Sequence, residues 1–169
     1  DRVAAALKLR DPQGNFTAVI NLQGDLPTID PLAIQRCLAG LTNETVDIAT
    51  IAARIESDAD VQNPNVVKAI APLGEGREVA YVRDFVRSTG PEHDAPFWRH
   101  INLYAYRREA LDRFASLPVS TREALRKLEQ MRSLDNDMRM AVVRVDSVPL
   151  SVGVPADLEA ARAMLRKKS

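Results

Sequence analysis

The feature that most constrains the fold is the alternation of short apolar runs with helical segments. Residues 17–22 (TAVINL) form an apolar run typical of a buried strand, and residues 31–40 (PLAIQRCLAG) follow with Pro31 in the first turn and Gly40 at the end, as in a helix. Residues 46–55 (VDIATIAARI) then alternate in the two-residue period of a second strand. Strands separated by helices predict a mostly parallel sheet that is covered on both faces.

The middle of the chain has a different pattern, in which strands follow one another without helices between them. Further strands are expected at 66–71, 78–86, 101–106 and 139–145, and turn-rich connections make the first three of them a partly antiparallel extension. A capping box, Ser120 to Glu123, opens a helix whose buried stripe is expected at Leu125, Leu128 and Leu134. A last helix is expected from residue 155, with Asp157 near its start and bases near its end, as the helix dipole favours. The prediction is an α/β fold of one domain over residues 1–169, with a mixed, mostly parallel sheet flanked by helices.

Composition excludes some classes of partner. The chain has 23 Lys plus Arg and 23 Asp plus Glu, so it has no net charge that would attract it to nucleic acid or to an anionic membrane. No apolar run approaches the roughly 18 residues of a membrane span, and the first residues lack the order of a signal peptide, so a soluble, cytoplasmic protein is expected. The single Cys37 is expected to be a buried, inert thiol.

One polar cluster stands at the end of the first predicted strand. Gln23, Gly24 and Asp25 follow TAVINL directly. Ligands of open α/β sheets bind beyond the carboxyl ends of strands, and a carboxylate there is a hard oxygen ligand of the kind Mg²⁺ takes alongside substrate phosphates. The other interpretation is an Asx-turn in which Asp25 binds its own backbone before Pro27. The residues themselves leave both open.

Five segments carry a family resemblance over nearly the whole chain. They are NLQGDLPTIDP (21–31), NPNVVK (63–68), RHINLYAYRREAL (99–111), LEQMR (128–132) and PADLEAARAML (155–165). In order and spacing they resemble the 3-deoxy-manno-octulosonate cytidylyltransferases, or CMP-Kdo synthetases. The resemblance implies a Rossmann-like nucleotide-diphospho-sugar transferase fold in a cytoplasmic, Mg²⁺-dependent enzyme of lipopolysaccharide synthesis, usually a homodimer. It implies that CTP and the sugar acid Kdo are converted to CMP-Kdo and pyrophosphate. It also implies that residues 1–169 correspond to the C-terminal two-thirds of such an enzyme.

The resemblance also assigns roles to residues. Asp25 matches the family's first metal-binding aspartate, and Gln23 matches a sugar contact beside it. His100 and Tyr104 match sugar-binding residues and are expected on one face of a strand. The alternative interpretation is that both side chains belong to the core and contact no ligand. Glu129 and Gln130 match the family's LEQ motif as sugar contacts, whereas without the resemblance they would be solvated surface residues.

Three departures from the family pattern bear on activity. The family's nucleotide-binding loop belongs well upstream of residue 21, and no phosphate-binding glycine motif occurs here, so weak CTP binding by this chain alone is expected. Gly153 stands where the family has its second metal aspartate, and Asp84 stands where an arginine is expected, one residue after Arg83. The alternative functions are a non-catalytic homologue that keeps the sugar-facing and dimerising half, and a related nucleotidyltransferase that uses another sugar acid.

Overall fold

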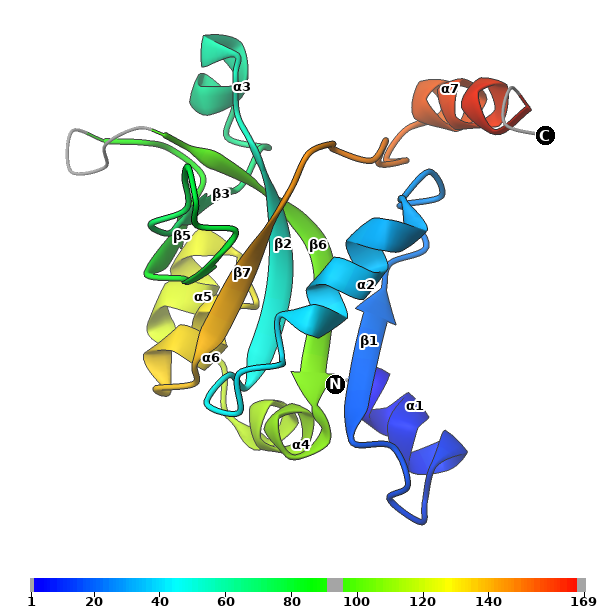
Figure 1. Cartoon of the computed structure of the whole chain (residues 1–169), viewed down its shortest axis with the longest axis vertical. Helices are drawn as coiled ribbons and strands as arrows, with labels where there is room; N and C mark the ends of the chain where they lie inside the picture. The colour runs from blue at the N-terminus through cyan, green and yellow to red at the C-terminus, as the bar shows by residue number, and fades with distance from the viewer. Residues whose placement is uncertain (1, 91–95, 167–169) are drawn as a thin grey trace.

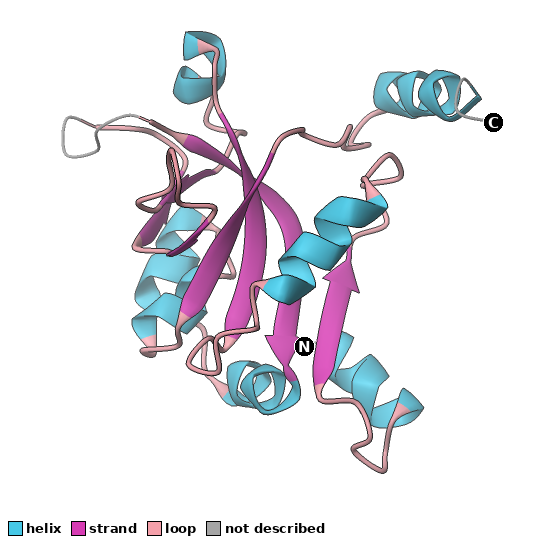
Figure 2. Cartoon of the chain, viewed as in Figure 1, coloured by secondary structure: helices cyan, strands magenta, loops and turns pink. Residues whose placement is uncertain are grey.

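A computed structural model describes residues 2–90 and 96–166. One sheet forms its centre, and helices cover both faces (Figures 1 and 2). The strands are β1 (Ala18–Leu22), β2 (Ile48–Arg54), β3 (Lys68–Ile70), β4 (Val79–Tyr81), β5 (Asp84–Val86), β6 (Trp98–Arg107) and β7 (Met140–Val145). The helices are α1 (Arg2–Arg10), α2 (Pro31–Ala39), α3 (Asp58–Gln62), α4 (Arg108–Ser116), α5 (Thr121–Arg126), α6 (Met131–Asp135) and α7 (Pro155–Arg166).

The sheet is mixed, as expected, but it is not mostly parallel. Its order is β4-β7-β2-β6-β3-β5, with β1 added alongside β6. Within the described residues only β2 and β7 pair in parallel, and every other pairing is antiparallel. The prediction was wrong because β6, a strand of ten residues, runs antiparallel to β1, β2 and β3 at once. Periodicity reports which residues face a core but not the direction of the neighbouring strand.

Alternate side chains of the central strands enter two separate cores. Ile48 and Ala52 of β2 face the core covered by α1, α4 and α6, whereas Ala49 and Ile51 face the core beneath α2. Cys37 lies in this second core as a free thiol, as predicted. Six consecutive residues of β2 are buried, so the alternation at 46–55 predicted a strand correctly although both of its faces are covered.

Three local predictions are corrected. The run at 78–86 forms two short strands, β4 and β5, instead of one. β1 is half-buried because it lies beside β6 alone. The helix opened by Ser120 ends at Arg126, because Lys127 takes a left-handed backbone conformation with a φ of 53°. Leu125 is therefore exposed, and only Leu128, beyond the helix end, is fully buried.

Other sequence signals are confirmed. The Ser120–Glu123 capping box is formed in both directions, and Asp30 caps α2 by accepting from the Leu32 amide. The last helix is present as α7, and its expected continuation through Lys168 lies outside the described residues. In the described part of the chain, no helix has the length and apolarity that a membrane span needs.

Gly40 is required by close packing between α2 and the sheet. A Cβ at this position would lie 2.8 Å from the Ala49 Cβ and 2.9 Å from the Val143 Cγ2, and both neighbours belong to buried strands. We expect Gly40→Ala to lower the free energy of unfolding by about 1–3 kcal/mol, as overpacking does. Urea unfolding measures the change, and Gly74→Ala is the control because no heavy atom lies within 4 Å of its added Cβ. Equal stability of the two variants would contradict the prediction.

Candidate active site

A cleft of about 420 Å³ opens beyond the carboxyl end of β1. Its walls come from the connection after β1, the loop before β3, the start of β6 and the loop between α5 and α6. Residues far apart in the sequence therefore meet there, where loops converge on one end of the strands. The side chains on its walls that can bind a ligand through polar atoms are Asp25, Asn65, Arg87, Arg99, His100, Asn102, Lys127, Glu129, Gln130 and Ser151.

Asp25 is exposed and lies on the wall of the cleft. Its Oδ2 accepts a hydrogen bond from the Ser151 hydroxyl at 3.1 Å, and within the described residues no main-chain amide donates to its carboxylate. The Asx-turn interpretation is therefore wrong for Asp25, since the turn is closed by the Leu26 amide on the Gln23 carbonyl instead. The carboxylate is free to bind a ligand in the cleft.

The carboxylate of Asp25 fits a Mg²⁺ site in which the substrate supplies most of the ligands. The described part of the chain contains no group of three or more His, Cys, Asp or Glu side chains that would hold a metal ion by themselves. Mg²⁺ is commonly bound by one or two carboxylates together with substrate phosphates, and Asp25 satisfies that requirement. Gly153 supplies no side chain, and the Asp157 Oδ2 accepts from the Gly153 and Val154 amides at 3.0 and 3.1 Å.

Arg87 and Lys127 are two cations among the residues that line the cleft. The Arg87 guanidinium, just after β5, donates to the carbonyl oxygens of Arg126, Pro64 and Lys127 at 3.0, 3.2 and 3.2 Å. These bonds join the loop before β3 to the loop after α5. Lys127 lies beside Arg87 on the cleft wall. The wall therefore carries positive charge that suits an anionic ligand.

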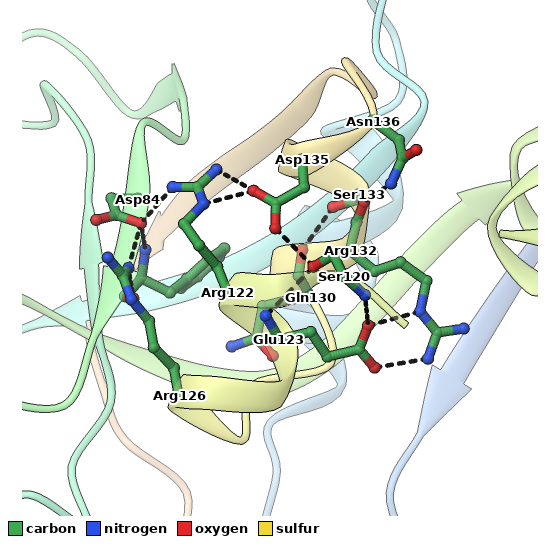
Figure 3. A network of polar contacts seen from close by, with 11 residues as sticks. Asp84, Ser120, Arg122, Glu123, Arg126, Gln130, Arg132, Ser133, Asp135 and Asn136 are labelled. Atoms are coloured by element: carbon green, nitrogen blue, oxygen red, sulfur yellow. Dashed lines mark hydrogen bonds and ion pairs between the residues drawn. The ribbon is translucent and has the colours of Figure 1, made fainter. Parts of the chain in front are cut away.

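A polar network fixes the loop that carries Glu129 and Gln130 (Figure 3). The Arg126 guanidinium donates to the Asp84 Oδ1 at 2.6 Å, and Arg132 donates to both carboxylate oxygens of Glu123 at 2.8 and 2.6 Å. These bonds hold the two ends of the loop between α5 and α6. Gln130 is buried against the cleft wall, whereas the side chain of Glu129 is largely exposed.

His100 lies at an irregularity in β6. The register between β2 and β6 shifts between Thr50 and Ile51, so that Thr50 pairs with Tyr104 and Ile51 with Ile101. The ring centroids of His100 and Tyr104 are 5.4 Å apart, although four residues of a regular strand span about 13 Å. The bulge therefore brings the two rings together, and Phe85 packs edge-on against His100 at 4.9 Å.

The structure groups four of the six predicted site residues. Asp25, His100, Glu129 and Gln130 line the cleft. Tyr104 is buried in the core between the rings of His100 and Tyr106, and Gln23 lies beside a separate depression near α1. Direct sugar contacts by Gln23 and Tyr104 remain predictions from the resemblance.

Comparison with known proteins identifies the family. A family model described as cytidylyltransferase matches residues 1–140. The chain is 48% identical over 166 residues to the 3-deoxy-manno-octulosonate cytidylyltransferase of Paramagnetospirillum magneticum, an alignment that covers 98% of this chain and 68% of that protein. It is 49% identical over 169 residues to the protein of the same name from Parvibaculum lavamentivorans, which covers all of this chain and 65% of the relative.

The chain belongs to the 3-deoxy-manno-octulosonate cytidylyltransferase family. This is a family of nucleotidyltransferase enzymes, as the resemblance implied. The chain spans about two-thirds of the length of these curated relatives.

Solved structures confirm the fold. CMP:2-keto-3-deoxy-manno-octonic acid synthetase, solved in complex with CTP, superposes with a TM-score of 0.85 at 29% identity and covers 98% of this chain and 68% of that one. Apo-UDP-glucose pyrophosphorylase superposes with a TM-score of 0.64 at 12% identity, over 99% of this chain and 61% of that one. The nucleotide-sugar transferase fold predicted for this cytidylyltransferase family member is therefore correct.

Sequence reasoning missed several residues in and beneath the cleft, among them two arginines and Thr50. Arg87 and Arg99 lie on the cleft wall and Arg83 does not, while Asp84 is bound to Arg126 and Arg122. Arg87 directly follows the strand predicted at 78–86, so the end-of-strand rule that found Asp25 could have found it as well. Thr50, which contacts His100, gave no signal because a β-branched hydroxyl residue is ordinary in a strand.

Burial of His100 makes stability depend on pH. Burial lowers the pKa of His100 from 6.5 to about 3. The unfolded chain therefore binds a proton at this residue between pH 6.5 and 3 that the folded chain does not bind, so the folded state loses stability as pH falls through this window. At 1.36 kcal/mol for each pH unit inside the window, the loss between pH 7 and pH 5 is about 2 kcal/mol.

Urea unfolding at pH 7 and pH 5 measures this loss. The matched control is His100→Gln, which keeps a polar side chain without a group that titrates in this range. Between pH 7 and pH 5, we expect the free energy of unfolding of the control to fall by about 2 kcal/mol less than that of the natural sequence. The same pH dependence in both proteins would contradict the assignment to His100.

Proposed function

We propose that the protein encoded by this gene forms CMP-Kdo and pyrophosphate from CTP and Kdo. One observation carries the proposal: Asp25, His100, Glu129 and Gln130, which come from distant segments, lie around a single cleft beyond the strand ends. Family membership supports the same reaction, since the curated relatives are named for it. A cytoplasmic location and a homodimer belong to the proposal on the strength of the family resemblance.

The chemistry is a substitution at phosphorus. The anomeric hydroxyl of Kdo attacks the α-phosphorus of CTP, its oxygen forms the new P–O bond, and the bond to the β-phosphate breaks as pyrophosphate leaves. A bound Mg²⁺ would neutralise charge on the phosphate oxygens. Asp25 is the residue of this chain that would hold the metal, because its carboxylate is exposed on the cleft wall and has one hydrogen-bond donor, Ser151.

The remaining residues orient the sugar acid. Arg87 and Lys127 give the wall a positive charge that complements the carboxylate of Kdo. Gln130 is held against the same wall by the network around α5 and α6 and offers an amide that both donates and accepts hydrogen bonds. Positioning of this kind is the main contribution a protein makes to nucleotidyl transfer.

The test is pyrophosphate release by the full gene product with CTP, Kdo and Mg²⁺. Turnover is expected with all three, and omission of Kdo or replacement of CTP by UTP is expected to abolish or strongly reduce it. A different sugar acid at equal concentration measures the preference for Kdo. Absence of turnover under these conditions would refute the proposed function.

The second candidate is a homologue that binds the sugar acid without catalysis. Gly153 favours this second candidate, because the family's second metal-binding carboxylate is expected at that position. The carboxylate of Asp157 does not replace it, since it already accepts hydrogen bonds from the Gly153 and Val154 amides. Calorimetric binding of Kdo together with no release of pyrophosphate would support this candidate over the first.

A further inference from the structure

Thr50 lies at the centre of the sheet and contacts His100. It is fully buried in β2, and its Oγ1 lies 2.9 Å from the His100 Nε2. The same oxygen lies 2.8 Å from the Leu103 carbonyl oxygen and 3.4 Å from the Ile101 carbonyl oxygen. The β6 bulge places both carbonyls and the imidazole around one hydroxyl group.

These distances determine which atom holds each proton. A hydroxyl has one proton to donate, and two oxygens 2.8 Å apart with no proton between them repel each other. Thr50 therefore donates to the Leu103 carbonyl. The His100 Nε2 must then donate to the Thr50 Oγ1, because that hydroxyl has no second proton to give. In a neutral imidazole this leaves Nδ1 as a pure acceptor.

The Nδ1 atom of His100 is open to the cleft. It has no hydrogen-bond partner among the described residues, and the one fully buried side-chain polar atom without a partner in that part of the chain is the Trp98 Nε1. Nδ1 therefore retains contact with solvent, and His100 lines the cleft. The rings of Phe85 and Tyr104 fix the plane of the imidazole.

We propose that Thr50 is a positioning residue that holds His100 as the Nε2–H tautomer, so that Nδ1 accepts a hydrogen bond from a hydroxyl group of the sugar. This inference rests on the proposed function. A carboxylate has no proton to donate to Nδ1, so the carboxylate of the sugar acid binds elsewhere, at the wall of Arg87 and Lys127. The low pKa of His100 agrees with a neutral ring.

The tautomer can be measured without activity. In the natural gene product labelled with ¹⁵N, long-range ¹⁵N–¹H spectra of the imidazole are expected to show a protonated Nε2 and an unprotonated Nδ1 for His100. In Thr50→Val, which has the same shape and no hydroxyl, we expect the Nδ1–H tautomer to become populated. Thr50→Ser keeps the hydroxyl and is expected to retain the natural pattern.

The sugar contact is tested by kinetics on the same three proteins. Loss of one oriented hydrogen bond is expected to raise the KM for Kdo about tenfold in Thr50→Val, with the KM for CTP within about twofold of the natural value. Thr50→Ser is expected to restore the KM for Kdo. A purely structural role for Thr50 would instead change both KM values and kcat together.

The outcomes separate this inference from the proposed function. A protonated Nδ1 in the natural protein overturns the tautomer assignment even if turnover is normal, and this spectrum does not depend on any variant folding. An unchanged KM for Kdo in Thr50→Val overturns the sugar contact. No turnover by the natural protein overturns the proposed function; calorimetric binding of Kdo to the natural protein and to Thr50→Val then decides the sugar contact, with equal affinities overturning it, and the spectrum still decides the tautomer.

Discussion

Asp25→Asn is expected to lower Mg²⁺-dependent pyrophosphate release by the full gene product at least about 100-fold. The physical reason is charge: the amide keeps the shape of the side chain but removes the anion that a hard divalent cation requires. Gly153 provides no second carboxylate to compensate, and Asp157 is held by the amides at the start of α7. The loss should be measured as initial rates over a range of Mg²⁺ concentrations, with a higher concentration needed for any residual rate.

The fold of Asp25→Asn is expected to be intact. Asp25 is exposed, and its carboxylate accepts one side-chain bond, from Ser151. Its thermal midpoint should therefore match that of Glu159→Gln, a control that neutralises an exposed carboxylate on α7 and should keep full activity. Full activity of Asp25→Asn, or the same loss in both variants, would rule out Asp25 as the metal ligand.

Glu123→Gln is expected to lower the free energy of unfolding by about 3–5 kcal/mol. Arg132 donates two hydrogen bonds to the Glu123 carboxylate, and the two side chains are only 6% and 11% exposed, respectively. Neutralising the glutamate removes the carboxylate that accepts both of these bonds, so the buried guanidinium keeps the Glu129 carboxylate at 3.9 Å but loses its nearest counter-charge. The same carboxylate completes the capping box with the Ser120 amide, so the start of α5 weakens as well.

Urea unfolding measures this change through the midpoint and the slope of the transition. The matched control is again Glu159→Gln, because Glu159 forms an exposed pair with Arg162 that is worth well under 1 kcal/mol. The double variant Glu123→Leu/Arg132→Met should recover part of the lost stability, since it removes both buried charges. Equal stability of Glu123→Gln and Glu159→Gln would contradict the burial argument.

The pair also predicts a pH dependence. Hydrogen bonds from Arg132 lower the pKa of Glu123 below its usual value of 4.5. Its contribution to stability is therefore fully present above pH 4.5 and is lost as pH falls through the lower pKa of the folded state. In Glu123→Gln, this part of the acid destabilisation should be absent.

Local signals in the sequence predicted local structure well. The capping box at Ser120, the proline at the start of α2 and the alternating pattern at 46–55 each produced the expected element. Asp25 was found from its place after β1, and its position on the cleft wall agrees with that reasoning. Where a helix ended for a purely conformational reason, at Lys127, the periodic pattern overran it.

The contacts that make the site were not predictable from the sequence. Periodicity placed His100 and Tyr104 on one face, but their contact depends on the bulge between β2 and β6, which shifts the pairing of Thr50 and Ile51. Arg87 reaches three carbonyls from two other segments, and no local pattern indicates such a contact.

The sequence by itself determined the family, from five segments in register along the chain, and also the sheet covered on both faces and the carboxylate at the end of β1, which follow from residue order within short windows. Only the tertiary structure decided the strand directions, the arginines on the cleft wall and the contact of Thr50 with His100. The physical reason is that these depend on distances between residues far apart in the chain, which are fixed by packing and strand pairing and not by neighbours in sequence.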